Sequence, residues 1–239
     1  MSTDLQLDDL VHAKIKAHCA RSDGLANAAK FEEAMIDDDI RCLSNAGGCF
    51  VKGTLVHTRE GNRPIDQIKV GDYVLSSPED GTGKPEYKRV KNVFVHQEKS
   101  IRKVYIFGPN PQFQFTLGAT GNHPFWVEGI GWTRADELQK DQVLRRADGS
   151  LAEVARQLPV YRTGRDGVGW VQMLDRLEGS YGSVFDYANY APVPLEQDEY
   201  LSNEVYNSDD PFLKVTVYNL DVEDFHTYYV GGKGYWVHN

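Results

Sequence analysis

The hydrophobic positions divide the chain into a helical start and a long β-rich body. Over residues 1–46 the apolar residues recur at helical intervals in two stripes, and the break between the stripes falls at residues 22–24. Residues 45–48 (Asn-Ala-Gly-Gly) then end the second predicted helix, because glycine readily adopts the left-handed conformation of a helix end. We therefore expect a short α-helical segment before the body of the protein.

From residue 49 onward the pattern changes to short strands. Runs rich in Val, Ile and aromatic residues alternate with turn signals, and no βαβ alternation is visible, so the body is predicted to be all-β. Residues 148–211 are less regular, and we expect an elaboration there that is part stranded and part loop. Residues 213–239 are predicted as two strands around a turn at Gly231-Gly232. The earlier strand-like runs are residues 49–58, 64–77, 89–97, 101–108 and 112–127, with a turn at 59–62 after the first.

Composition narrows the class of protein. The chain has 239 residues, 41% of them hydrophobic, which is ordinary for a globular protein with a sizeable core. The net charge of −9 argues against a nucleic-acid-binding surface, and no apolar run is long enough to span a membrane. The acidic, polar N-terminus resembles no signal peptide. The three cysteines are odd in number, which favours thiols in a reducing compartment over a disulfide scaffold.

Two ends of the β-rich body carry side chains that can break peptide bonds. Cys49 can attack the carbonyl carbon of Gly48 and convert that amide into a thioester. Asn239 can attack its own backbone carbonyl through the side-chain nitrogen, which closes a five-membered ring and breaks the peptide bond that follows. His238 beside it can supply the proton transfers. This combination predicts a chain that cuts itself.

The residues around these ends resemble the Hint (hedgehog/intein) superfamily. The matching motifs appear in the family's order, and they are most similar to the pretoxin Hint domains of bacterial polymorphic toxins and to bacterial intein-like domains. The resemblance covers about residues 49–147 and 213–239. It implies a pseudo-symmetric, mostly β horseshoe over residues 49–239, with 148–211 as its elaboration and 1–48 as a helical upstream flank. The motifs are residues 49–58, 65–76, 120–127, 131–138 and 217–239.

The resemblance also implies roles at the N-terminal cleavage site. Cys49 matches the family's first nucleophile, and Gly48 carries the bond to be cut. Residues 120–123 match the Thr-x-x-His motif, so His123 would protonate the amide nitrogen as it leaves. Thr120 and the backbone of Asn122 would hold the polarised amide and its developing oxyanion.

At the C-terminal end, His238 and Asn239 match the family's last two residues. His226 matches the histidine that assists cyclisation of the asparagine. The chain departs from the commonest intein pattern at Asn219, where many inteins carry Asp. Asp221 points to the same strand face by period-two alternation and could replace it, although the pattern favours a solvated strand carboxylate.

The predicted function is single-turnover autoprocessing of a bacterial toxin precursor by a cysteine nucleophile. Cleavage at Cys49 and cyclisation of Asn239 would release a C-terminal toxin domain absent from this chain, and splicing would additionally need Cys, Ser or Thr after Asn239. The partners are then the chain's own flanking segments. We expect a monomer without nucleic-acid or membrane partners, made in the bacterial cytoplasm before export or delivery as part of a larger toxin. No Cys/His spacing resembles a zinc site, and no cofactor is expected.

Two other functions remain open from the sequence. A hedgehog-like thioester transferase would share Cys49 and His123 but would not need His238 and Asn239. A non-catalytic β module could hold toxin flanks in place with Cys49 inert. The remaining cysteines, Cys19 and Cys42, are predicted to be core thiols, and the remaining histidines are predicted to be structural or on the surface: His12, His18, His57 and His96.

Overall fold

The computed structural model describes residues 47–108, 114–172, 182–193, 205 and 207–239. The predicted N-terminal helices lie outside these residues, as do Cys19, Cys42, His12 and His18. Among the described residues, none forms a helix with the length and apolar character that a membrane span requires.

The described residues fold mainly into strands, which confirms the predicted mostly β class. A short 3₁₀ helix, η1 (Ile65–Gln67), interrupts them once. In chain order the strands are β1 (Phe50–Val51), β2 (Leu55–Thr58), β3 (Gly61–Pro64), β4 (Tyr73–Ser76), β5 (Glu86–Ser100), β6 (Arg102–Phe107), β7 (Gln114–Ala119), β8 (Pro124–Val127), β9 (Gly131–Arg134), β10 (Val143–Arg145), β11 (Leu151–Pro159), β12 (Tyr161–Arg162), β13 (Val168–Gln172), β14 (Gly182–Asp186), β15 (Ala191–Pro192), β16 (Lys214–Val222), β17 (Thr227–Val230) and β18 (Tyr235–His238).

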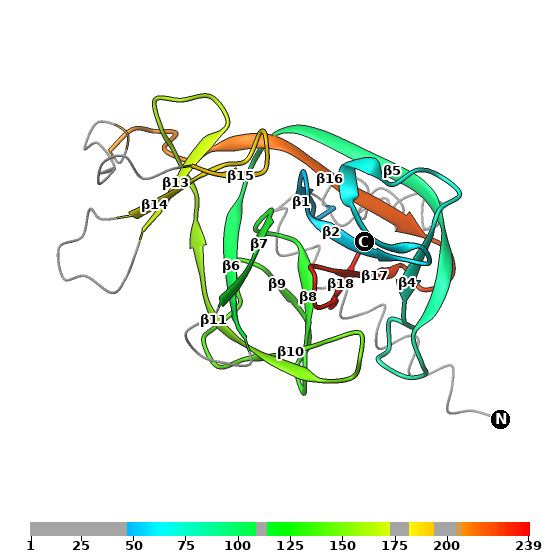
Figure 1. Cartoon of the computed structure of the whole chain (residues 1–239). Coiled ribbons are helices and arrows are strands. Elements are labelled where there is room, and N and C mark those ends of the chain that lie inside the picture. Colours follow the sequence, from blue (N-terminus) through cyan, green and yellow to red (C-terminus); the bar gives the residue numbers. More distant parts are fainter. Residues whose placement is uncertain (1–46, 109–113, 173–181, 194–204, 206) are drawn as a thin grey trace, which may run out of the picture. The chain divides into compact units, whose positions relative to one another are not determined.

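The main sheet closes on itself. Its strand order is β10-β11-β6-β7-β1-β16-β5-β4-β2-β17-β18-β8-β9, and β10 pairs with β8 as well as with β11. Closure pairs backbone N–H and C=O groups that would otherwise remain unpaired at the edges of the sheet. It also inserts the first strand of the body between β7 and β16, and the last strand between β17 and β8 (Figure 1).

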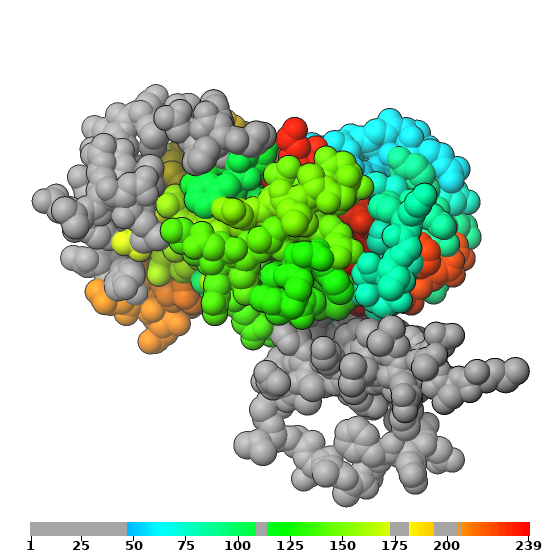
Figure 2. Space-filling view, turned by 90° about the horizontal axis from the view of Figure 1, so that it is seen from below, coloured from blue at the N-terminus to red at the C-terminus, as the bar shows by residue number. Residues whose placement is uncertain are grey.

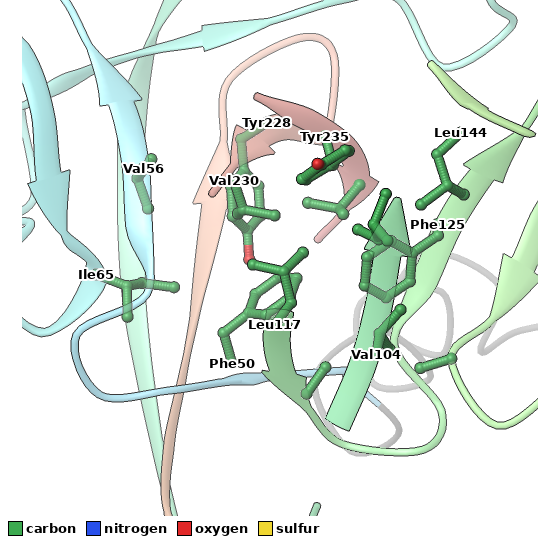
Figure 3. Packing of buried hydrophobic residues seen from close by; sticks show 14 of the residues in the cluster. Phe50, Val56, Ile65, Val104, Leu117, Phe125, Leu144, Tyr228, Val230 and Tyr235 are labelled. Carbon is green, nitrogen blue, oxygen red and sulfur yellow. The ribbon is translucent and has the colours of Figure 1, made fainter. Parts of the chain in front are cut away.

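The core fills the interior of this closed sheet with side chains from strands distant in the sequence. Phe50, fully buried, packs edge-on against Phe125 and Tyr228, with ring centroids 6.0 and 6.3 Å apart. Figure 3 shows Leu117 and Val230 pointing into the same space. Truncating a buried aromatic residue costs about 3–5 kcal/mol, so Phe50 fixes the position of its neighbour Cys49.

A second, four-stranded sheet, in the order β12-β13-β14-β15, comes from the predicted elaboration. Val171 of β13 and Tyr187, which follows β14, belong to one hydrophobic cluster with Cys49 and with Val51 of β1. The first strand of residues 148–211, β11, runs instead in the main sheet between β10 and β6. The elaboration therefore packs against the strand that carries the predicted nucleophile.

Three details differ from the sequence pattern. Residues 49–58 are not one strand, because a turn at Gly53 (φ 79°) separates β1 from β2. The predicted turn at 59–62 is shorter, since β3 already begins at Gly61. Residues 213–239 form three strands rather than two, because the long β16 precedes the β17–β18 hairpin. Short turns between β-rich runs leave only a weak signal in an alternation pattern.

Candidate active site

The turn between β7 and β8 lies next to both ends of the body. Before the turn, Ala119 of β7 pairs with Phe50 of β1; after it, Phe125 of β8 pairs with Val237 of β18. Residues 120–123 are therefore held between the strand after Cys49 and the strand before Asn239. A further hydrogen bond anchors this turn: the Asp136 N–H donates to the Gly121 carbonyl at 2.9 Å.

Cys49 is held by two hydrogen bonds to Thr120. The Cys49 N–H donates to the Thr120 hydroxyl at 2.8 Å, and the Thr120 N–H donates to the Cys49 carbonyl at 2.9 Å. The cysteine is 1% exposed, and burial raises the pKa of its thiol to about 12, with Lys99 opposing the shift. The nitrogen of the Gly48–Cys49 bond thus has a defined acceptor, while the thiol is protonated at neutral pH.

His123 lies directly against Gly48. A Cβ atom added to Gly48 would lie 2.5 Å from His123 Nδ1, so only glycine allows this approach. The ring packs on Phe50 with centroids 4.1 Å apart. Burial lowers the pKa of His123 to about 3; a hydrogen bond with the Gly48 backbone opposes the shift and His238 adds to it. His123 is therefore a buried, neutral imidazole beside the Gly48–Cys49 bond.

His238, which is 4% exposed, joins Asn239 to a carboxylate from another part of the chain. Its Nδ1 lies 2.9 Å from the Asn239 carbonyl oxygen, and its Nε2 lies 3.2 Å from Glu79 Oε2. The ring also meets Trp132 edge-on at 5.2 Å. On the face drawn in Figure 2, the red C-terminal residues reach the surface only in small areas between the green and cyan parts of the chain.

Asn239 is fixed through both its backbone and its side chain. Its N–H donates to the His226 carbonyl at 2.9 Å. With the side-chain amide oriented to satisfy its neighbours, its nitrogen donates to the His226 carbonyl at 2.8 Å and its oxygen accepts from the Val222 N–H at 3.2 Å. Asn239 thus contacts the backbone carbonyl oxygen of His226 and not its ring.

The His226 ring faces Asp221 instead. Its Nδ1 lies 4.0 Å from Asp221 Oδ1, and the side chain is 39% exposed. His226 has a φ of 50°, in the left-handed region that residues other than glycine seldom adopt. This conformation turns the chain between β16 and β17 and directs the His226 carbonyl to Asn239.

Asn219 and Asp221 have separate partners. Asn219 is buried, and its Oδ1 accepts from the Tyr228 hydroxyl at 2.7 Å and from the Leu220 N–H at 2.8 Å. Asp221 accepts from the Asn92 amide at 2.9 Å. Burial raises the pKa of Tyr228, with nearby Cys49 contributing, so the Asn219–Tyr228 pair adjoins the cysteine.

Sequence reasoning missed Glu79, Tyr228 and Trp132. Glu79 lies in a polar loop, and nothing in its surroundings in the sequence distinguishes it from a solvated turn residue. Its contact with His238 spans 159 positions and follows only from closure of the sheet. Among the described residues, no three His, Cys, Asp or Glu side chains cluster as metal ligands would. His57, predicted to be structural, contacts the Gly231 carbonyl at 2.9 Å.

Comparisons with known proteins agree with this arrangement. Residues 55–160 match the family described as the pretoxin HINT domain. The solution structure of a bacterial intein-like domain from Clostridium thermocellum is similar at 25% identity, with a TM-score of 0.52, over 80% of this chain and 98% of that one. A DnaB intein from Synechocystis sp. PCC 6803 is similar at 16% identity, with a TM-score of 0.49, over 80% and 98%. No curated protein sequence matches significantly. The described residues therefore have a Hint-like, intein-like fold, and residues 55–160 match the pretoxin HINT family.

Proposed function

We propose that this Hint-like domain is a single-turnover autoprocessing enzyme that breaks two bonds of its own precursor. One is the Gly48–Cys49 peptide bond and the other follows Asn239. The pretoxin match implies a larger precursor with flanking segments. In the proposal, residues 1–48 are the end of the upstream flank and a toxin is the downstream one. The precursor is made in the bacterial cytoplasm and delivered as part of a larger secreted toxin.

The observation that carries the proposal is the environment of the Gly48–Cys49 bond. Thr120 accepts the hydrogen bond of its N–H, and the fully buried ring of His123 lies against Gly48. A neutral imidazole beside a scissile amide can accept a proton and return it.

In the first step Cys49 Sγ bonds to the carbonyl carbon of Gly48, and the bond from that carbon to Cys49 nitrogen breaks. The thiol loses a proton and the departing nitrogen gains one, so the step needs no external acid or base. His123 carries that proton, and Thr120 orients the nitrogen. Water or an external thiol then opens the thioester and frees residues 1–48. Transfer through His123 matters because a thiol with a pKa of about 12 supplies almost no free thiolate at neutral pH.

In the second step the Asn239 side-chain nitrogen bonds to the backbone carbonyl carbon of Asn239, and the bond from that carbon to the following residue breaks. The proton lost by the side-chain amide balances the one gained by the leaving amine. The hydrogen bond to the His226 carbonyl orients the attacking nitrogen, and His238 Nδ1 faces the oxygen that gains charge.

One observation favours the alternative of a non-catalytic module. Reactive cysteines usually have a lowered pKa, whereas burial raises the pKa of Cys49 to about 12. In that case the Cys49 side chain would serve only in the hydrophobic cluster with Val171 and Tyr187.

Mass spectrometry of the intact protein decides between them. Thiols open thioesters far faster than amides, so dithiothreitol should release a fragment that ends at Gly48. Cys49→Ala should abolish the release, whereas Cys42→Ser, which removes a thiol that the proposed mechanism does not use, should not. A wild-type chain that stays intact in dithiothreitol over days would favour the non-catalytic module. Release from the alanine variant would indicate another nucleophile or a contaminating protease.

A further inference from the structure

We propose that Glu79 is a positioning residue for cleavage after Asn239: it holds the His238 ring in the orientation that directs Nδ1 at the Asn239 carbonyl oxygen. This inference rests on the proposed function of the C-terminal end. It assigns a role to a loop residue between β4 and β5, outside the Hint motifs named above.

The hydrogen-bond chemistry of the His238 ring carries the inference. Glu79 Oε2 lies 3.2 Å from Nε2 and the Asn239 carbonyl oxygen lies 2.9 Å from Nδ1. A carbonyl oxygen only accepts hydrogen bonds, and so does an ionised carboxylate. The ring therefore lies between two acceptors, and Glu79 fixes its orientation from the Nε2 side.

The position of Glu79 is fixed by contacts on both sides. The Ser76 hydroxyl donates to the Thr227 carbonyl at 2.7 Å, and the Ser77 N–H donates to the Thr227 hydroxyl at 3.1 Å. Thr227 pairs directly with His238 across the β17–β18 hairpin. The Trp132 indole N–H donates to the Glu79 carbonyl at 3.2 Å, and its ring packs edge-on against His238. The loop that carries Glu79 is thus tied to the strand pair that carries His238.

This arrangement stabilises charge where the reaction creates it. When the Asn239 side-chain nitrogen attacks, the backbone carbonyl oxygen of Asn239 becomes an oxyanion. Nδ1 of His238 already lies within hydrogen-bond distance of that oxygen, and a donor aimed at a developing oxyanion is worth about 10²–10³ in rate. Glu79 holds the same ring from its other side, at Nε2.

The test uses the full chain extended after Asn239 by a reporter domain that begins with Ala, which excludes splicing. We expect Glu79→Gln to slow reporter release by about tenfold or more, because the amide keeps the shape but not the charge. Glu79→Asp keeps a carboxylate that can accept from Nε2, and it should restore the rate to an intermediate value.

Asp80→Asn is the matched control, since the neighbouring Asp80 bonds to Thr82. It should release the reporter at the wild-type rate. Equal rates for Glu79→Gln and the wild type would overturn the role of Glu79. A Glu79→Asp rate no better than that of Glu79→Gln would also overturn it. A wild-type chain that releases no reporter would instead contradict the proposed cleavage after Asn239.

Discussion

His123 occupies the space that a side chain at position 48 would need. A Cβ atom on Gly48 would lie 2.2 Å from His123 Cα, which is a backbone atom and cannot rotate away. No residue larger than glycine therefore fits at position 48 in the present packing, because the backbone of His123, the proposed proton carrier, fills the space.

Gly48→Ala should therefore slow release of residues 1–48 and destabilise the fold. Overpacking a tight site costs about 1–3 kcal/mol, and here the displaced group is the histidine itself. Gly232→Ala is the control, because no atom lies within 4 Å of its added Cβ. Dithiothreitol-induced cleavage can be followed by mass spectrometry. It should be slower in Gly48→Ala than in the wild type, and unchanged in Gly232→Ala. Equal cleavage rates would show that the turn can move aside without loss of function.

Removing the proton carrier should slow thioester formation without moving the cut. We expect His123→Gln to reduce the rate about 10²–10⁴-fold, the usual contribution of a positioned acid or base. Glutamine is preferable to alanine because His123 is fully buried between Phe50 and Phe125, and truncation would leave a cavity. Single-turnover cleavage in dithiothreitol measures the rate, and circular dichroism verifies the fold. Wild-type kinetics in the variant would leave His123 only a packing role.

His123 should also make the fold sensitive to acid. Burial lowers the pKa of His123 to about 3 in the folded protein, below its usual value of 6.5. Between these values the unfolded chain binds a proton that the folded chain excludes, so stability is present above about pH 6.5 and falls as pH drops toward 3. The loss is at most about 1.4 kcal/mol per pH unit.

Urea unfolding at pH 7 and pH 4.5 measures this contribution. The free energy of unfolding should drop more for the wild type than for His123→Gln, since other titrating groups are common to both. A drop of the same size in the two proteins would mean that His123 is protonated in the folded state.

The two C-terminal histidines should differ in importance. His238 contacts the reacting carbonyl through its ring, whereas His226 contacts Asn239 through its backbone carbonyl. In the reporter fusion, His238→Ala should slow release about 10²-fold or more, as expected for loss of an oxyanion donor. His226→Gly, which suits the positive φ at this position, should slow release far less.

Asn239→Ala removes the ring-closing nitrogen and should stop release entirely. The upstream product of the wild type should first carry an aminosuccinimide, lighter by one water than a free asparagine terminus. A plain asparagine carboxylate at the earliest times would indicate ordinary hydrolysis. A larger effect from His226→Gly than from His238→Ala would return the main role to the His226 side chain.

The sequence predicts the class of fold, and it offers Cys49 and Asn239 as candidate residues, because both leave local signals. Alternating apolar residues predict the strands, and Cys49 and Asn239 have side chains with distinctive reactions. The Thr-x-x-His motif is also local, and its hydrogen bond to Cys49 follows from the β7–β8 turn. At His226, the sequence does not indicate that the contact with Asn239 is made by the backbone carbonyl.

Contacts that depend on closure of the sheet could not be predicted. Glu79 reaches His238 across 159 positions, and Tyr228 reaches Asn219 only after β16 and β17 have both been placed. The break at Gly53 was missed for a similar reason, because the Tyr190 ring from the elaboration packs against that turn. Such positions become identifiable only when the spatial neighbours are known.

The strand order also determines when a newly made chain can become active. β1 is completed early in synthesis, yet it pairs with β16, and Glu79 meets His238 only after β18 has been made. A ribosome must therefore translate the whole domain before the site can assemble. Under the proposed function, the order of the strands in the chain delays self-cleavage until synthesis of the domain is complete.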